Sequence, residues 1–481
     1  MTEFQTVVGL EFHAELKTNT KIFCSCPTTF AGEPNTHVCP VCLGLPGVLP
    51  VLNKRAVELA MKAGLALNCQ ISPFSKFDRK NYFYPDLPKA YQVTQYPLPI
   101  CKSGYITVPD ADGNEKKIRI NRIHLEEDAG KLVHSGESIS TSNYSLPDYN
   151  RAAVPLIEIV SEPDMASADE AKAFGDKLKL ILEYAGVSDV KMEQGSLRCD
   201  VNISLMPKGS DKLGTKVEIK NLNSFRAMYR AIQFEEDRQR RMIEKGEKLI
   251  QETRTWDEGS GRTLSMRSKE NDHDYRYFPE PDLVPTVITP EWIEAVRSEL
   301  PELPDTREQR LKEECGLSDY DCAQIVDTPA LAFFFDEVAK LFPDTKIIAN
   351  WLLGDVSRLM NSAEKEYEQV PIVAEDLVYL LDQAKSGAIN NNSAKTVLEE
   401  MFTSGKMPAE IISERGFAQI SDSAMLEDAV KAVIEANEKA AEDFRTGKQQ
   451  AMGFLMGQIM KATKGQANPN LVKELLAKML K

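Results

Sequence analysis

Hydrophobic and polar positions alternate in short runs through about the first 290 residues, and this pattern predicts strands separated by turns. Three longer segments instead show the spacing of amphipathic helices. One of them begins at Ser167 with Glu170 three positions on, which is a capping-box signature, and ends at Gly186. The three helices are expected at 54–67, at 167–186 and from Phe225 to Arg241.

Beyond about residue 290 the alternation of β-branched residues disappears and helical periodicity dominates. Thr289 followed by Pro290 predicts a helix start. Further breaks are expected at 301–304, 342–344, 386–392 and 404–408, and the last resembles a linker. A chain of 481 residues is also too long for one core. The pattern therefore predicts an α+β domain at 1–290, a helical domain at 291–405 and a small helical tail at 406–481.

Several predicted strands carry polar side chains on one face. In the run 7–13, Val8, Leu10 and Phe12 point one way, whereas Glu11 and His13 point the other way, because side chains alternate along a strand.

The run 199–205 repeats this design, with Asp200, Asn202 and Ser204 on one face. After a loop rich in Gly, Ser, Asp and Lys, Glu218 and Lys220 share a face of the run 216–221. The two runs predict an antiparallel hairpin with a joint polar face.

Two more segments add carboxylates, one of which contains Glu126 and the other Glu158. An antiparallel sheet with one solvated face shows such alternation without any function. That explanation weakens for Glu158, which interrupts an apolar strand where an unpaired charge is costly. Carboxylates, an imidazole and lysines on such faces predict a site for Mg²⁺ and nucleotide phosphates. The chain contains no Gly-x-x-x-x-Gly-Lys-Ser/Thr loop, so any ATP is expected to bind on a sheet.

Four cysteines stand in one window as Cys-x-Cys, twelve residues, then Cys-x-x-Cys. Paired thiolates at short spacing suit tetrahedral zinc. The other five cysteines are scattered singly, which favours a reducing compartment and zinc over disulfides. Four reduced thiols are the alternative. The proposed ligands are Cys24, Cys26, Cys39 and Cys42.

The stretch 77–89 places Arg79, Lys80 and Lys89 among aromatic residues. Basic and aromatic side chains interleaved in this way can hold phosphates and stack on bases, so these three residues are candidates for binding a cofactor. A hairpin with ordinary aromatic packing is the alternative.

The net charge of −15 argues against a surface coated with nucleic acid, but residues 446–481 contain six lysines and one glutamate. An acidic body with a basic tail fits a nucleic-acid partner touched at selected places. We expect a cytoplasmic protein, because the N-terminus lacks a signal peptide and no apolar run is long enough to span a bilayer. No Gly-x-Ser-x-Gly or amidase signature occurs, so a hydrolase site of its own is not expected.

Taken together, these motifs resemble the B subunit of the aspartyl/glutamyl-tRNA amidotransferases over essentially the full length. The resemblance is carried by the Val-Gly-Leu-Glu run with His13, the Cys-Pro-Val-Cys-Leu-Gly run and the stretch 77–89. It is also carried by the runs 124–131, 157–164, 198–204 and 214–225.

The resemblance implies a cradle with a glutamine-synthetase-like antiparallel sheet, a helical domain and a tail that grips tRNA. It implies that ATP and Mg²⁺ are used to phosphorylate the side-chain carboxylate of Glu-tRNA(Gln) or Asp-tRNA(Asn). Ammonia from a partner amidase subunit then displaces the phosphate, and a small third subunit completes a heterotrimer.

By position, the resemblance makes Glu11, His13 and Glu126 the best candidates for the magnesium and phosphoryl-transfer site. Glu158, Asp200, Glu218 and Lys220 follow from the polar faces. The zinc is expected to be structural. A zinc-bearing RNA-binding module without catalysis is the competing hypothesis, although it has no need of carboxylates on the hairpin faces.

Overall fold

The computed structural model describes residues 3–135, 143–268, 275–417, 423–445, 450–463, 467 and 469–480. The chain divides into two compact units, Met1–Pro304 and Asp305–Lys481. Strands belong to the first unit and the second unit is helical where it is described, which confirms the α+β prediction. In the described residues, no helix combines the length and apolar character needed to cross a membrane.

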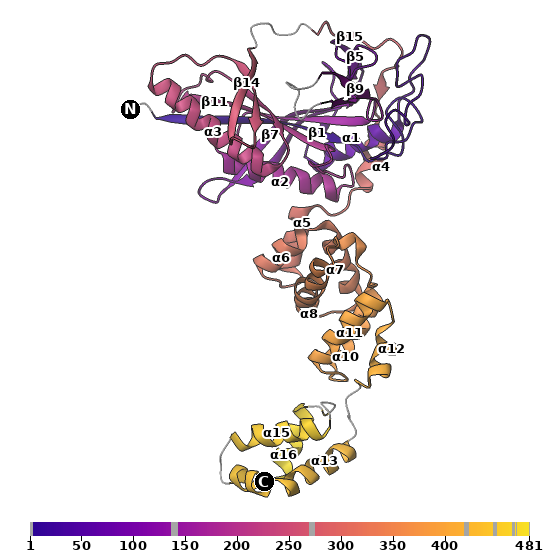
Figure 1. Cartoon of the computed structure of the whole chain (residues 1–481), viewed down its shortest axis with the longest axis vertical. Coiled ribbons are helices and arrows are strands. Elements are labelled where there is room, and N and C mark those ends of the chain that lie inside the picture. Colours follow the sequence, from indigo (N-terminus) through magenta and orange to yellow (C-terminus); the bar gives the residue numbers. More distant parts are fainter. Residues whose placement is uncertain are drawn as a thin grey trace. The chain divides into compact units, whose positions relative to one another are not determined.

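A nine-stranded sheet forms the middle layer of the first unit, in the order β14-β13-β12-β11-β1-β10-β7-β6-β2 (Figure 1). Neighbouring strands are antiparallel except for β12 and β13, which are parallel. The strands of this sheet are β1 (Phe4–Glu15), β2 (Gln70–Ile71), β6 (Cys101–Pro109), β7 (Glu115–Glu127), β10 (Pro155–Ser161), β11 (Leu197–Pro207), β12 (Val217–Leu222), β13 (Glu252–Asp257) and β14 (Arg262–Ser268).

Helices cover one face of this sheet. The predicted helices are confirmed as α1 (Lys54–Ala66), α2 (Ala168–Tyr184) and α3 (Phe225–Glu244), and α4 (Pro290–Ser298) begins at the predicted Thr289–Pro290. Phe12 of β1 is fully buried there, with its ring 6.2 Å from that of Phe174 and 6.3 Å from that of Phe225. Val8 and Leu10 are buried in the same core. The alternation along β1 thus leaves Glu11 and His13 on the opposite face.

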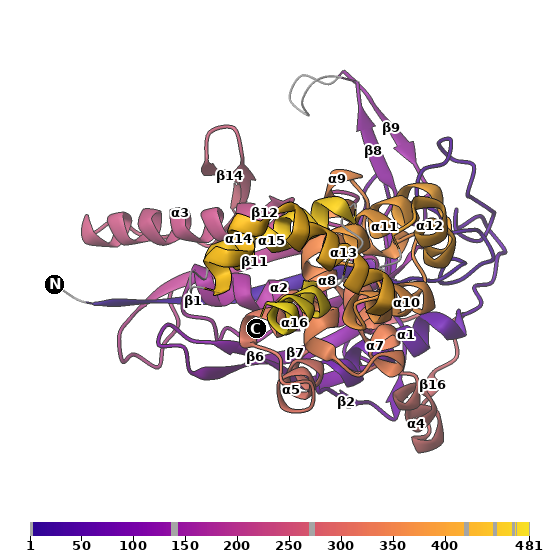
Figure 2. The same cartoon turned by 90° about the horizontal axis from the view of Figure 1, so that it is seen from below.

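Small sheets and turns lie on that opposite side (Figure 1). β4 (Asp78–Asn81) pairs with β5 (Tyr91–Thr94) and with β15 (Phe278–Pro279), and β5 packs against β7. A hairpin of β8 (Lys131–His134) and β9 (Ser145–Asp148) extends outward from the first unit (Figure 2). The remaining short pair is β3 (Phe74–Ser75) with β16 (Thr286–Val287).

The second unit begins with a group of helices, of which α7, α10 and α11 end at predicted breaks, whereas the others end at positions that the sequence pattern did not predict. α12 contacts both α10 and α11, and Arg415 donates to Glu400 at 3.0 Å. The helices of this group are α5 (Pro304–Glu313), α6 (Asp319–Val326), α7 (Pro329–Leu341), α8 (Thr345–Trp351), the π-helical turn η2 (Leu352–Val356), α9 (Ser357–Ser362), the 3₁₀ turn η3 (Tyr367–Gln369), α10 (Ala374–Lys385), α11 (Asn391–Ser404) and α12 (Pro408–Arg415).

The last four helices share a hydrophobic cluster of their own, which includes Leu426, Val430, Leu455, Ile459 and Leu476. They are α13 (Ser423–Ala436), α14 (Glu438–Arg445), α15 (Gln450–Ala462) and α16 (Pro469–Met479). Of the six tail lysines, Lys448, Lys464 and Lys481 lie outside the described residues.

Candidate active site

A cluster of carboxylates and imidazoles occupies the polar face of the three central strands β1, β10 and β7. His13 Nε2 lies 3.4 Å from Glu158 Oε2, 3.7 Å from Glu11 Oε1 and 3.9 Å from Glu126 Oε1. The antiparallel register explains this grouping, because His13 lies opposite Glu158. The structure therefore brings together four residues that the sequence placed on three separate segments.

His124 belongs to the same cluster, although we did not select it as a site residue from the sequence. It lies opposite Glu158 in the register, with its Nε2 3.4 Å from Glu158 Oε2 and 3.5 Å from Glu126 Oε2. Its buried Nδ1 has no hydrogen-bond partner in the described structure. The period-two spacing of His124 and Glu126 on one strand was the available signal, since it places both side chains on one face.

Burial and charge compete at each titratable group of the cluster. Burial acts to lower the pKa of His124, but the charge of Glu158 and hydrogen bonds to Glu126 and Glu158 outweigh it and raise the pKa to about 9. Burial likewise acts against the raised pKa of His13, which the hydrogen bond and charge of Glu158 produce. Conversely, the charge of His124 holds the pKa of Glu158 well below its usual value despite burial.

Glu11 behaves differently, because burial and the charge of Glu158 both raise its pKa. The negative charge of the carboxylates is therefore not fully balanced within the cluster, and it favours the protonated forms of Glu11, His13 and His124. A bound cation meets the same need. Ligand atoms of Glu11, His13 and Glu158 lie within 4.8 Å of one another, as do those of His124, Glu126 and Glu158. These residues fit a divalent metal, since carboxylates with imidazole are common ligands of such ions.

The polar face continues onto the predicted hairpin of β11 and β12. Asp200 lies opposite Glu11 in the register, and Lys220 Nζ donates to Asp200 Oδ2 at 2.6 Å. Lys220 also lies 3.5 Å from Glu218 Oε1, and Glu218 accepts from Thr253 Oγ1 at 2.8 Å. The charge of Lys220 reaches Glu11, whose pKa it acts to lower. A lysine thus borders the cluster on one side.

The three basic residues of the aromatic stretch have different surroundings. Arg79 makes two 2.7 Å hydrogen bonds to the Glu280 carboxylate. Lys89 contacts both oxygens of Glu127 at 2.5 and 2.6 Å. Among the described residues Lys80 has no carboxylate within 4.0 Å, and burial acts to lower its pKa, but the negative charge of Glu126 raises it. Lys80 is therefore the one of the three that faces the cluster with its charge unpaired.

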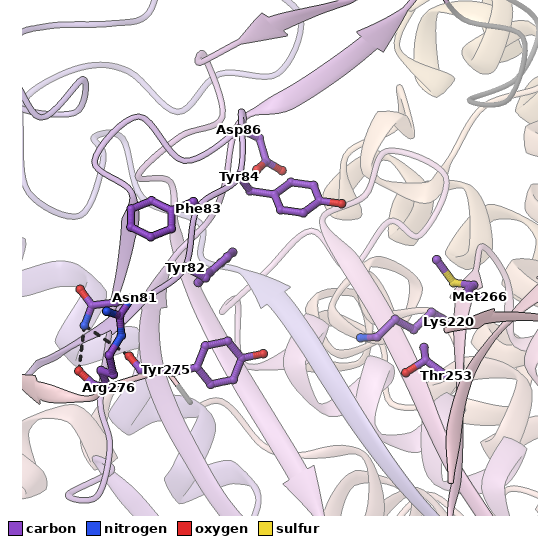
Figure 3. Close-up of a pocket in the computed structure, with 10 residues that line it drawn as sticks. All are labelled: Asn81, Tyr82, Phe83, Tyr84, Asp86, Lys220, Thr253, Met266, Tyr275 and Arg276. Carbon is purple, nitrogen blue, oxygen red and sulfur yellow. Dashed lines mark hydrogen bonds between the residues drawn. The ribbon is translucent and has the colours of Figure 1, made fainter. Parts of the chain in front are cut away.

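A cavity of about 670 Å³ opens between this stretch and the edge of the hairpin. Figure 3 shows Tyr84 and Tyr275 pointing toward Lys220 and Thr253 across it. The ammonium of Lys80 lies 4.9 Å from the ring centre of Tyr275 and 5.7 Å from that of Tyr82. The volume is that of a complete small-ligand site, about 300–1,000 Å³.

The four cysteines of the sequence window come together in the segment that connects β1 to α1. Their sulfur atoms all lie within 4.8 Å of one another, and Cys39 and Cys42 Sγ are 3.9 Å apart. Tetrahedral zinc with bonds of about 2.3 Å needs sulfurs about 3.8 Å apart, so the four thiols fit it. Lys21 Nζ lies 3.7 Å from Cys42 Sγ. A hydrogen bond shared with Cys24 lowers the pKa of Cys42 to about 4, which favours the thiolate that zinc binds.

The fold and this cluster define a class of domain in which buried and half-buried carboxylates and imidazoles line one face of a large, mainly antiparallel sheet. Comparison with known proteins identifies the family. Residues 6–294 match the GatB/GatE catalytic domain and residues 333–480 match the GatB domain. The chain belongs to the GatB family.

Relatives named as the B subunit of an aspartyl/glutamyl-tRNA(Asn/Gln) amidotransferase match over the whole length. The protein of Carboxydothermus hydrogenoformans is 56% identical over 476 residues, which cover 99% of this chain and 98% of the relative. That of Moorella thermoacetica is 56% identical over 479 residues, covering 99% of this chain and 100% of the relative. That of Thermodesulfovibrio yellowstonii is 52% identical and covers all of both chains.

Proposed function

We propose that this chain is the B subunit of a tRNA-dependent amidotransferase that converts Glu-tRNA(Gln), Asp-tRNA(Asn) or both to the amide form, with ATP as the activating substrate. The observation that supports this most directly is the cluster of Glu11, His13, His124, Glu126 and Glu158 on a sheet face beside two cavities. Membership of the family and the whole-length relatives support the same reaction.

The reaction requires that a carboxylate oxygen of the aminoacyl side chain attack the γ-phosphorus of ATP while ADP departs. Ammonia then forms the carbon–nitrogen bond and phosphate leaves. Mg²⁺ bound by Glu11, His13, Glu126 and Glu158 would neutralise the phosphate charge. His124 holds Glu158 and Glu126 in place, and Lys220 and Lys80 add positive charge on either side.

The large cavity suits the 3′ end of the aminoacyl-tRNA. Tyr82, Phe83 and Tyr84 line it, and Phe83 is 77% exposed, so unstacked bases can pack on these rings. We place the aminoacyl adenosine there, with its side-chain carboxylate directed past Lys220 toward His13. Because the sequence lacks an amidase signature, ammonia is expected from a partner amidase subunit, in a heterotrimer with a small third subunit.

The proposed division is still into a catalytic, a helical and a tail domain, but the contacts favour boundaries later than residues 290 and 405. Val296 of α4 is buried in the first core and Trp292 Nε1 donates to Glu58 at 3.3 Å, which favours a catalytic domain that extends to Pro304. The contacts of α12 favour a tail that starts after Arg415, and its lysines support tRNA binding. The glutamine-synthetase-like relationship of the cradle and the structural zinc at the four cysteines remain part of this proposal.

The test is Glu11→Gln in the reconstituted complex, supplied with both misacylated tRNAs. ATP-dependent phosphorylation of the aminoacyl group should fall by at least about 10²-fold, because removal of a metal-binding charge removes electrostatic stabilisation. Glu115→Gln, at an exposed position where β7 begins, is the matched control. Phosphorylation at the normal rate in Glu11→Gln would overturn the site assignment, and the preferred tRNA would identify the substrate.

A non-catalytic RNA-binding module is not favoured. Such a module has no use for three carboxylates and two imidazoles gathered in one cluster in which His124, Glu126 and Glu158 are buried, since burial of these groups is costly. ATP turnover that depends on aminoacyl-tRNA would eliminate this alternative.

A further inference from the structure

The side chain of Lys21 is completely buried, which is unusual for a cation. Lys21 lies in the segment that connects β1 to α1, and its ammonium donates to the Tyr149 carbonyl at 3.1 Å and to Cys42 Sγ at 3.7 Å. No carboxylate lies within 4.0 Å of this ammonium in the part of the chain that the structure describes. A buried charge is costly unless it is paired, so the ammonium calls for a counter-charge.

The cysteine cluster supplies that counter-charge once its thiols are thiolates. Zn²⁺ bound by four thiolates leaves two negative charges in excess. Cys42 is the buried member of the cluster, whereas the other three cysteines are half-buried and can be reached by water. A hydrogen bond from the Lys21 ammonium to Cys42 Sγ therefore offsets the excess charge at the sulfur that water solvates least.

The backbone of Lys21 is held by the same turn that carries two of the proposed ligands. Its N–H donates to the Cys26 carbonyl at 2.9 Å, and its carbonyl accepts from Asn53 Nδ2 at 3.4 Å. Asn53 is the N-cap residue of α1, so the turn is also attached to a buried helix. The ammonium is thus aimed at the cluster by backbone contacts on both sides and needs little rearrangement to reach a bound metal's thiolate.

The second acceptor of Lys21 belongs to the segment 147–150, at the end of β9. Asn35, in the loop between the two cysteine pairs, donates through Nδ2 to the Pro147 carbonyl at 3.0 Å and accepts from the Tyr149 N–H at 2.8 Å. Lys21 and Asn35 therefore attach this segment to the cysteine cluster from two directions. A metal that closes the loop between the cysteine pairs strengthens both attachments.

The next residue, Arg151, connects the segment 147–150 to the end of β7. Its guanidinium donates to the carbonyls of Ala129 and Gly130 at 3.0 and 2.9 Å. These residues follow the strand that carries Glu126 of the carboxylate–imidazole cluster. Lys21 thus stands where the thiol cluster meets the chain that supports one end of the candidate active site.

We propose that Lys21 is a positioning residue of the zinc site. Its ammonium donates a hydrogen bond to the metal-bound Cys42 thiolate, and through the Tyr149 carbonyl it fastens the segment 147–150 to the metal site. It acts by charge and by hydrogen bonding, without being a ligand itself. This inference rests on the zinc site of the proposed function and adds a residue outside its four ligands.

The experiment measures the zinc affinity of the reconstituted complex by competition with a chelator of known affinity. Lys21→Met should bind zinc about 10- to 100-fold more weakly, as expected when a hydrogen bond to a metal ligand is lost. In the cobalt-substituted complex the same variant should shift the thiolate-to-metal charge-transfer band, because the hydrogen bond withdraws charge from sulfur. Lys17→Met is the matched control and should change neither quantity, since Lys17 is 64% exposed and pairs with Asp189.

Hydrogen exchange of the amides at 147–151 is the second readout, because it reports how firmly this segment is held. Removal of zinc from the wild-type complex should speed this exchange, which tests the inference even where Lys21→Met does not fold.

Unchanged zinc affinity in Lys21→Met would overturn the inference and would leave Lys21 as a donor to the Tyr149 carbonyl alone. Unchanged exchange at 147–151 after removal of zinc from the wild type would overturn it as well. Both outcomes leave the zinc site intact as long as the wild-type complex binds zinc. A wild-type complex that binds no zinc would instead remove the zinc site from the proposed function.

Discussion

His124 Nε2 lies 3.4 Å from Glu158 Oε2, and the two residues are direct partners in the register of β7 and β10. This pairing fixes the position of a carboxylate that His13 also contacts from the other neighbouring strand. One glutamate thus connects two imidazoles across three strands. The position of the Glu158 carboxylate therefore depends on both His13 and His124.

We therefore predict that His124→Ala lowers ATP-dependent phosphorylation of aminoacyl-tRNA at least about tenfold, as the loss of a group that positions a ligand typically does. The same variant should raise the Mg²⁺ concentration required for half-maximal activity. His134→Ala is the control, because His134 lies on the β8–β9 hairpin and its Nδ1 contacts Ser145 Oγ at 2.7 Å. Equal activity of the two variants would show that His124 has no part in the site.

Lys80 and Lys89 should respond differently to replacement by methionine. Lys80→Met should lower kcat with little change in the free energy of unfolding, since the ammonium faces the cluster without a carboxylate partner within 4.0 Å among the described residues. Lys89→Met should destabilise the fold by about 3 kcal/mol, because it leaves the buried Glu127 carboxylate without its counter-charge. Urea unfolding and initial rates distinguish the two. Matching stability losses would contradict the assignment.

Glu280→Gln should destabilise the protein in a pH-dependent manner. Burial acts to raise the pKa of Glu280, but the hydrogen bond from Arg79 outweighs it and lowers the pKa below 4.5. The stabilisation is complete above 4.5 and is lost as pH falls through the lower pKa of the folded state. The variant should therefore be about 2 kcal/mol less stable at pH 7. The difference should shrink at pH values below the pKa of the folded state. A constant difference at all pH values would show that the charged pair does not form.

Replacement of Cys39 and Cys42 by serine should release zinc and lower the melting temperature of the first unit. The physical reason is that metal binding free energy is folding free energy. Metal analysis and thermal unfolding measure the two effects, and Cys69→Ser, at a buried thiol outside the cluster, serves as the control. Loss of phosphorylation chemistry at an unchanged melting temperature would show that these cysteines act in the reaction.

Truncation after Phe417 should weaken tRNA binding and leave the helices before it folded, because α12 packs on α10 and α11. We expect the salt dependence of tRNA affinity to become less steep, since lysines that contact phosphates are removed. Fluorescence titration at two salt concentrations measures this. Unchanged affinity and slope would exclude the tail from tRNA binding.

The sequence alone determined the elements and their buried faces. The caps at Ser167 and Thr289 are local, because each side chain accepts from an amide three residues on, at Glu170 and Trp292. Period-two alternation likewise fixed which side of β1 carries Glu11 and His13, since that depends only on the pleat of one strand. The cysteine spacing also predicted the thiol cluster, because the four cysteines lie close together in the chain.

Only the tertiary structure decided which polar faces meet. Strand order and register are set by packing between segments that are separated in the sequence, so Glu158 could be placed between His13 and His124 only after folding. The ion pair of Arg79 with Glu280 also joins distant segments, and it distinguishes Arg79 from the next residue, Lys80, which has no carboxylate within 4.0 Å in the part of the chain that the structure describes. A local pattern shows which side chains are polar, whereas the order and register of the strands determine which of them come into contact.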